Sequence, residues 1–177
     1  MSLPRPEADA LFSAWMAEHG GILARVARSH ARDERGRQDL ERELAYQVWL
    51  SAPRFAAGAK PSTWIYRICL NTALTWRRNA ARHEQRTEGE NAAAELPAGG
   101  PDPAARAERG DLLEHLFSAL RALPDADRSL LLLQLDGLAY RDIADVTGMT
   151  ENHVGVALTR ARQRLTAQMK GILHELD

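Results

Sequence analysis

The amino-acid sequence predicts an all-α fold of two small helical domains joined by a flexible linker, the C-terminal domain containing a helix-turn-helix. Helix-favouring residues dominate the 177-residue chain, and no run of alternating apolar and polar residues indicates a strand. Apolar residues recur at helical spacing on both sides of a stretch rich in proline and glycine. We therefore expect one domain in residues 1–84, a linker in 85–108 and a second domain in 109–177.

Three helices are predicted in the N-terminal domain. The first spans about 7–31, and the Gly20-Gly21 pair predicts a kink or break in it. A second helix is stopped by Pro53, and a third begins near Pro61, which suits the first helical position. The apolar stripe of the second helix consists of Leu40, Leu44 and Val48. Three such helices form one small bundle.

The C-terminal domain follows a segment without a helical pattern. Between Glu88 and Pro103 the chain has three prolines and three glycines and almost no large apolar side chains, which is typical of a linker. Helical periodicity resumes at Leu112, stops at Pro124, and returns in a leucine-rich run that ends at Gly137.

The composition excludes several classes of protein. The longest strongly apolar run, Leu130 to Leu135, is far shorter than the roughly 18 to 20 residues that span a bilayer, and no apolar stretch follows Met1 as in a signal peptide. The single cysteine, Cys69, cannot form an internal disulfide and has no neighbours typical of a metal site. We expect a cytoplasmic protein with no membrane insertion, no metal and no cofactor.

Basic and acidic residues are concentrated in different segments of the chain, although the formal net charge is only -1. Residues 54–86 contain seven basic residues and one acid, whereas residues 87–111 contain six acids and two basic residues. The basic segment also carries four aromatic residues, namely Phe55, Trp64, Tyr66 and Trp76. Cations follow a phosphate backbone and aromatic rings stack on unpaired bases, so the segment suits single-stranded or opened DNA. The alternative is that these rings fill the core of the bundle.

Residues 138–165 have the pattern of a helix-turn-helix. Gly148 supplies the turn and Thr150 caps the second helix. Helical spacing turns one set of residues inward, namely Val154, Leu158, Ala161 and Leu165. The outward set is Asn152, Val156, Thr159, Arg160 and Gln163, flanked by Arg162 and Arg164. Amide, hydroxyl and guanidinium groups read base edges, and flanking arginines reach phosphates, so the pattern predicts DNA binding; a helical hairpin with a solvated polar face is the alternative.

Two blocks of the sequence carry a resemblance to a known family. The first block consists of Asp39-Leu40-Glu41-Arg42-Glu43, Trp49, Phe55, Ser62 to Ile68, Asn71 and Arg77-Arg78. The second consists of Leu123-Pro124, Arg128, Gly137 to Ala144 and Arg160 to Leu165. Together they resemble bacterial RNA polymerase sigma factors of the extracytoplasmic-function (ECF) group, whose minimal members have two domains. Where the family commonly has glutamine and aspartate, this chain has Arg42 and Thr75. Where the family usually has polar or basic residues, it has Gly155, Val156 and Ala157.

The resemblance implies partners and roles for particular residues. It implies docking of the second helix on core RNA polymerase through Asp39, Glu41 and Glu43. It implies contacts to the minus-ten element of promoter DNA through Lys60, Ser62, Trp64, Arg67, Asn71, Trp76, Arg77 and Arg78. It assigns the C-terminal domain to the minus-thirty-five element, and it implies regulation by an anti-sigma factor, which such proteins often have.

We therefore predict a sigma factor that binds core polymerase, directs promoter-specific initiation and helps to open the minus-ten element, without catalysing a reaction. One alternative is a helix-turn-helix regulator of duplex DNA that acts without polymerase. A regulator of that kind needs a ligand or dimer domain in the N-terminal half, and has little use for a basic, aromatic segment after an acidic helix. A third class, a metal-dependent enzyme, is opposed by six scattered histidines and by the absence of His-Asp, His-Glu-x-x-His and glycine-loop motifs.

Overall fold

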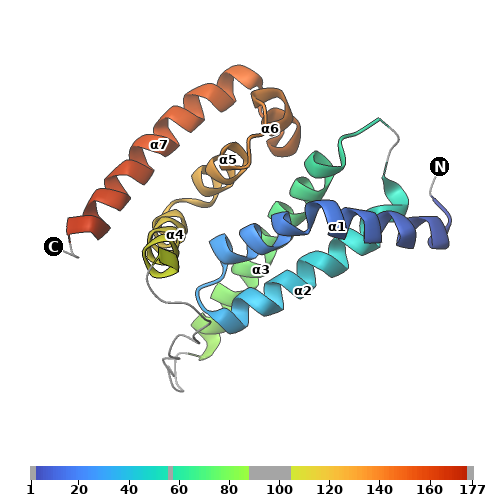
Figure 1. Cartoon of the computed structure of the whole chain (residues 1–177), viewed down its shortest axis with the longest axis horizontal. Helices are drawn as coiled ribbons and strands as arrows, with labels where there is room; N and C mark the ends of the chain where they lie inside the picture. The colour runs from blue at the N-terminus through green and yellow to red at the C-terminus, as the bar shows by residue number, and fades with distance from the viewer. Residues whose placement is uncertain (1–2, 56–57, 88–104, 175–177) are drawn as a thin grey trace.

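The computed structural model of the chain describes residues 3–55, 58–87 and 105–174. These residues form seven α-helices and a short 3₁₀ helix and contain no strand, which confirms the all-α prediction. Figure 1 shows α1 to α3 packed together as one group and α4 to α7 as a second group beside it. Most of the predicted linker, 88–104, lies outside the described residues.

The N-terminal group is a three-helix bundle. It consists of α1 (Arg5–His30), α2 (Glu34–Ser51) and α3 (Pro61–Thr87), with a 3₁₀ turn at Ala52–Arg54. The predicted stripe of α2 is fully buried, and on α3 Ile65, Cys69 and Ala73 meet it in the core. Tyr66 is also buried, at 1% exposure, so this ring belongs to the core and is not free to stack on bases.

The predicted break at Gly20-Gly21 is wrong, because α1 is continuous from Arg5 to His30. Trp15 precedes the glycine pair and Ile22 follows it, and both side chains are buried in the same core. A glycine in a helix interior costs only about 1 kcal/mol relative to alanine. Burial of large apolar side chains on both sides of the pair outweighs that cost.

The C-terminal group contains α4 (Ala105–Ala122), α5 (Asp125–Leu135), α6 (Tyr140–Thr147) and α7 (Glu151–His174). Arg128 joins α4 to α5, because its guanidinium donates to the carbonyls of Leu120 at 2.9 Å, Arg121 at 2.7 Å and Leu123 at 2.8 Å. These acceptors belong to the end of α4, where carbonyls lack helical partners. Burial, with the nearby charge of Arg77, lowers the pKa of Arg128 to about 10.

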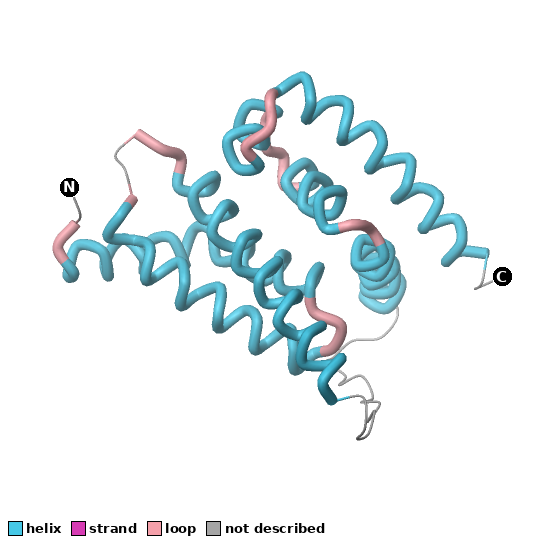
Figure 2. Tube along the Cα trace, turned by 180° about the vertical axis from the view of Figure 1, so that it is seen from behind, coloured by secondary structure: helices cyan, strands magenta, loops and turns pink. Residues whose placement is uncertain are grey.

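The two groups pack directly against each other. Helix α1 contacts α4 and α5, and α3 contacts α5 and α6, an arrangement that Figure 2 shows from behind. Arg28 of α1 lies over the ring of Phe117 at 4.8 Å and donates to Glu114 at 2.8 Å. None of the helices in the described ranges is long and apolar enough to cross a membrane.

Candidate nucleic-acid interface

The helix-turn-helix has the turn and cap that the sequence predicts. Gly148 ends α6 with a φ of 76°, in the left-handed region, and its N–H donates to the carbonyl of Ala144 at 2.8 Å. The hydroxyl of Thr150 accepts from the backbone N–H of His153 at 3.3 Å, at the start of α7. Both local predictions are confirmed.

Helix α7 divides into the two predicted faces. The inward residues Val154, Leu158 and Ala161 have no exposed surface, and Leu165 is half-buried. All five outward residues are exposed, namely Asn152, Val156, Thr159, Arg160 and Gln163. Val156 places an apolar group, 52% exposed, in this set. The exposed set combines amide, hydroxyl, guanidinium and methyl groups, which are the groups that recognise base edges in a major groove.

Two arginines are held in place at the borders of this face. Arg162 donates through Nε to the side chain of Gln134 at 2.9 Å and through Nη2 to the Tyr140 hydroxyl at 3.3 Å. Arg164 forms an ion pair with Asp127. Arg162 therefore has neutral partners, whereas the charge of Arg164 is compensated within the domain.

Tyr140 also lies against Gly155 on α7. A Cβ atom at residue 155 would stand 3.4 Å from the tyrosine ring, so the glycine leaves room for the ring to approach the helix. Sequence reasoning did not identify Tyr140 as the residue that holds Arg162. The spacing between Gly155 and Arg162, two helical turns, is the signal that places both on the side of α7 facing α6.

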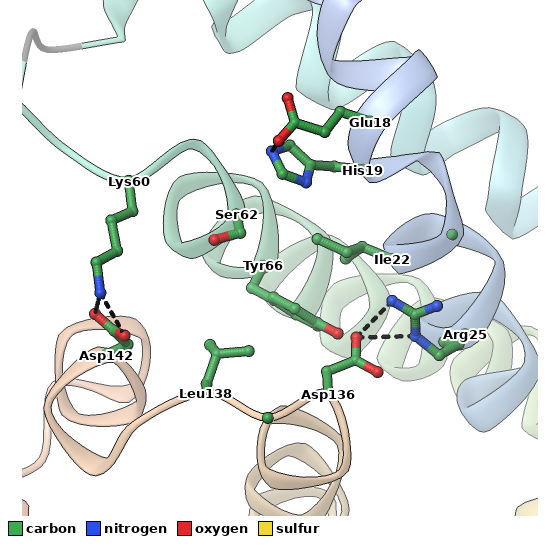
Figure 3. A pocket seen from close by; sticks show the side chains of 12 residues that line it. Glu18, His19, Ile22, Arg25, Lys60, Ser62, Tyr66, Asp136, Leu138 and Asp142 are labelled. Atoms are coloured by element: carbon green, nitrogen blue, oxygen red, sulfur yellow. Dashed lines mark hydrogen bonds and ion pairs between the residues drawn. The ribbon is translucent and has the colours of Figure 1, made fainter.

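Three predicted DNA-binding cations of the N-terminal domain contact the C-terminal domain. The Lys60 ammonium lies 2.7 and 2.8 Å from the two carboxylate oxygens of Asp142, as Figure 3 shows. Arg67 donates to the backbone carbonyl of Asp145, and Arg77 forms an ion pair with Asp125. Sequence analysis did not single out these acids, although residues 124–147 contain five acids and only two basic residues.

Asn71 and Trp76 lie on another side of α3. Together with Asp39 and Glu43 of α2 they line a groove between the two helices. The resemblance assigned the first two residues to DNA and the other two to polymerase, but the structure brings all four together. Trp76 is half-buried and packs against the core of the bundle.

The remaining predicted minus-ten residues are distributed around the start and the exposed side of α3. Trp64 is half-buried, with its ring edge-on to Phe55 at a centroid distance of 5.7 Å. Ser62 lines a cavity between the domains. Arg78 is exposed and donates to the Thr75 hydroxyl at 3.2 Å.

The acids predicted to bind polymerase do not share one face of α2. Asp39 and Glu43 are four residues apart and lie on the same side. Glu41 lies on the opposite side, with a carboxylate oxygen 3.8 Å from Arg37. Neighbouring groups engage the other two acids, because Asp39 pairs with Arg42 at 2.7 Å and Glu43 accepts from Gln47 at 2.9 Å.

A cavity of about 380 Å³ lies between the domains. Arg25 of α1 and Asp136 after α5 form an ion pair at 2.6 Å on its wall, and Tyr66 and Leu138 face each other nearby (Figure 3). Among the residues that the structure describes, no group of three or more histidine, cysteine or acidic side chains could hold a metal ion.

Comparison with known proteins supports both halves of this arrangement. The family model "Sigma-70 region 2" matches residues 15–83, and "Sigma-70, region 4" matches residues 113–165. The chain is 26% identical over 161 residues to the RNA polymerase sigma factor NccH of Alcaligenes xylosoxydans xylosoxydans, covering 90% of this chain and 87% of that protein. It is 26% identical over 163 residues to the ECF RNA polymerase sigma factor SigE of Mycolicibacterium smegmatis, covering 89% of this chain and 62% of that protein.

A solved structure has the same fold. The sigma factor RpoE from Bartonella quintana, crystallised with the anti-sigma factor NepR, superposes with a TM-score of 0.68. The sequence identity is 23%, and the match covers 90% of this chain and 96% of that one.

The all-helical fold and the helix-turn-helix of α6 and α7 define a helical DNA-binding transcription factor. With region 2 and region 4 matched in order, the chain belongs to the sigma-70 family, as an ECF sigma factor. It binds core RNA polymerase and directs transcription initiation at promoters. The region 2 match covers the half of the chain that an independent regulator would use for a ligand or dimer domain, which disfavours that alternative.

Proposed function

We propose that α7 reads the minus-thirty-five element and that α3, with the residues preceding it, binds and helps to open the minus-ten element. The observation that carries the first assignment is the division of α7, whose five predicted reading residues are all exposed while the opposite stripe is buried. Support for the second is the basic character of residues 54–86, because cations along one helix suit a phosphate backbone.

Arg162 and Arg164 make unequal contributions under this proposal. Each is positioned at the border of the reading face, where phosphates pass. Asp127 already compensates Arg164, whereas the partners of Arg162 within the described part of the chain, Gln134 and Tyr140, are neutral. Arg162 therefore supplies the larger share of the counterion release on binding.

We also propose that α2 docks on core polymerase through its acids. The side chains of Asp39 and Glu41 are 49% and 40% exposed, so their charges are available to a basic partner surface. Since Glu41 and Glu43 lie on different sides, Glu41→Lys and Glu43→Lys should weaken binding unequally in a pull-down with core polymerase. Glu18→Lys on α1, where the side chain is 77% exposed, is the matched control. Unchanged binding of both α2 variants would refute this assignment.

We also propose a regulatory partner and a cellular location for the protein. The similarity of fold to a sigma factor crystallised with an anti-sigma factor supports an anti-sigma protein as a partner of this chain. We place the protein in the cytoplasm, where core polymerase acts on DNA, as a specificity subunit that leaves the chemistry of RNA synthesis to polymerase.

The test is in vitro transcription and promoter binding by core polymerase loaded with this chain, on singly substituted promoters at several salt concentrations. Arg162→Gln should weaken binding to every promoter and reduce the salt slope by about one, and Arg164→Gln should reduce it less. Asn152→Ala and Gln163→Ala should each cost about 1 to 3 kcal/mol at one base pair.

Gln168→Ala, at an exposed position of α7 beyond the reading face, is the control. It should alter neither the salt slope nor the base preference. Base preferences that survive both Asn152→Ala and Gln163→Ala would show that the outward face is not the reading surface.

A further inference from the structure

The C-terminal domain occupies cations that the proposed function assigns to promoter DNA. The contacts lie along one side of α3, from the residue before its start to its middle. They are Lys60 with the Asp142 carboxylate, Arg67 with the Asp145 carbonyl, and Arg77 with the Asp125 carboxylate. Two helices of the C-terminal domain, α5 and α6, provide the acceptors.

These acceptors have the chemistry of a nucleic-acid backbone. Carboxylate and carbonyl oxygens accept from ammonium and guanidinium groups as phosphate oxygens do. Arg67 and Arg77 are ten residues apart, which corresponds to about 15 Å along a helix, so the contacts extend over several nucleotide spacings. A DNA strand cannot use these three side chains while α5 and α6 lie against them.

The individual contacts are weak enough to be exchanged. Lys60 is 67% exposed although its partner Asp142 is only 14% exposed, and Arg77 and Asp125 are 33% and 43% exposed. Because each ion pair has at least one member in contact with solvent, it contributes little individually and is screened by salt. A polyanion that offers several phosphates at once can therefore replace them.

We infer that this arrangement is a closed state, in which α5 and α6 act as an internal substitute for DNA and mask the minus-ten surface of α3. The inference rests on the proposed assignment of α3 to the minus-ten element. Binding of that element then requires the two domains to separate, and core polymerase promotes binding by holding them apart.

The first experiment measures the distance between the domains in the full chain. Donor and acceptor dyes are attached at Ala14→Cys on α1 and Thr166→Cys on α7, two exposed positions. The native Cys69 is fully buried, and burial raises the pKa of its thiol, which protects it from labelling. The double variant Asp125→Asn/Asp142→Asn should lower the transfer efficiency, and so should raising the salt concentration.

The second experiment measures binding of a forked minus-ten DNA. Loss of two ion pairs that are partly open to solvent should raise the affinity of the free double variant by about two- to twentyfold. The holoenzyme should show no such change, because its domains are already apart. Glu7→Gln/Glu34→Gln removes the same charge from exposed positions on α1 and α2 and is the control for general electrostatics.

Exchanging the charges of Lys60 and Asp142 distinguishes loss of their ion pair from a folding defect. Asp142→Lys alone should lower the transfer efficiency, and the added change Lys60→Asp should restore it. Parental transfer efficiency and parental DNA affinity in the double variant would overturn the inference. Lowered transfer efficiency in a chain whose holoenzyme does not bind promoter DNA would instead contradict the proposed function of α3.

Discussion

Replacing Arg128 with methionine should remove most of the stability of the C-terminal domain. The side chain is 1% exposed and donates to three carbonyls at the end of α4. Methionine keeps the apolar stem but removes the donor. The Leu120 carbonyl still accepts from the backbone N–H of Leu123 at 3.1 Å, so the carbonyls of Arg121 and Leu123 are the ones left unsatisfied. Each unsatisfied buried acceptor costs about 1 to 3 kcal/mol, and part of this loss is offset because the guanidinium no longer has to be desolvated. We expect the free energy of unfolding to fall by about 2 to 4 kcal/mol.

Urea titration with two probes localises the effect. All four tryptophans lie in the N-terminal domain, so their fluorescence reports unfolding there, whereas far-ultraviolet circular dichroism reports helices of both domains. Arg128→Met should move the dichroism transition to lower urea concentration than the fluorescence transition. Arg141→Met, at an exposed position on α6, is the control. A shift for Arg128→Met no larger than for the control would refute the reasoning.

Three further predictions concern stability and opening. Trp64→Ala should lower the melting temperature more than Trp76→Ala. Only Trp76→Ala should reduce the permanganate reactivity of promoter thymines, which reports DNA opening. Equal stability losses without an effect on opening would exclude base stacking by Trp76. Burial lowers the pKa of His30 from 6.5 to about 4, so the neutral imidazole stabilises the fold fully above pH 6.5, and the free energy of unfolding falls by roughly 3 kcal/mol as the pH falls toward 4. In His30→Gln the urea midpoint should therefore depend less on pH between pH 7 and pH 5 than in the parent. Gly20→Ala should raise the melting temperature, since no atom stands within 4 Å of the added carbon, whereas Gly148→Ala should lower it because φ is 76°.

The sequence was sufficient to predict features that depend on neighbours within a few residues. The buried and exposed faces of α7 follow from helical spacing, and the turn at Gly148 follows from the absence of a side chain at that residue. The break predicted at Gly20-Gly21 is wrong because it depended on the local preference of glycine alone. Packing of distant segments against α1 outweighs that preference.

Contacts between the domains could not be predicted in the same way. Lys60 and Asp142 are 82 residues apart, and Arg77 and Asp125 are 48 apart, so no local periodicity relates them. Contacts between distant segments also explain why the predicted DNA-binding residues of α3 lie on different sides of the helix. Packing of α3 between α2 and α6 directs Asn71 toward one neighbour and Arg67 toward the other.

The glycine at position 155 has a consequence for how promoter preference can change. An alanine there would just touch Tyr140, and a longer side chain would have to turn toward the groove or displace the ring. Displacing the ring would release Arg162 from its hydroxyl partner. A mutation that adds a base contact at position 155 therefore also loosens the neighbouring contact of Arg162 with the DNA phosphates. New preferences are acquired more readily at Val156 or Thr159, where the side chains are exposed and the angle between α6 and α7 is left intact.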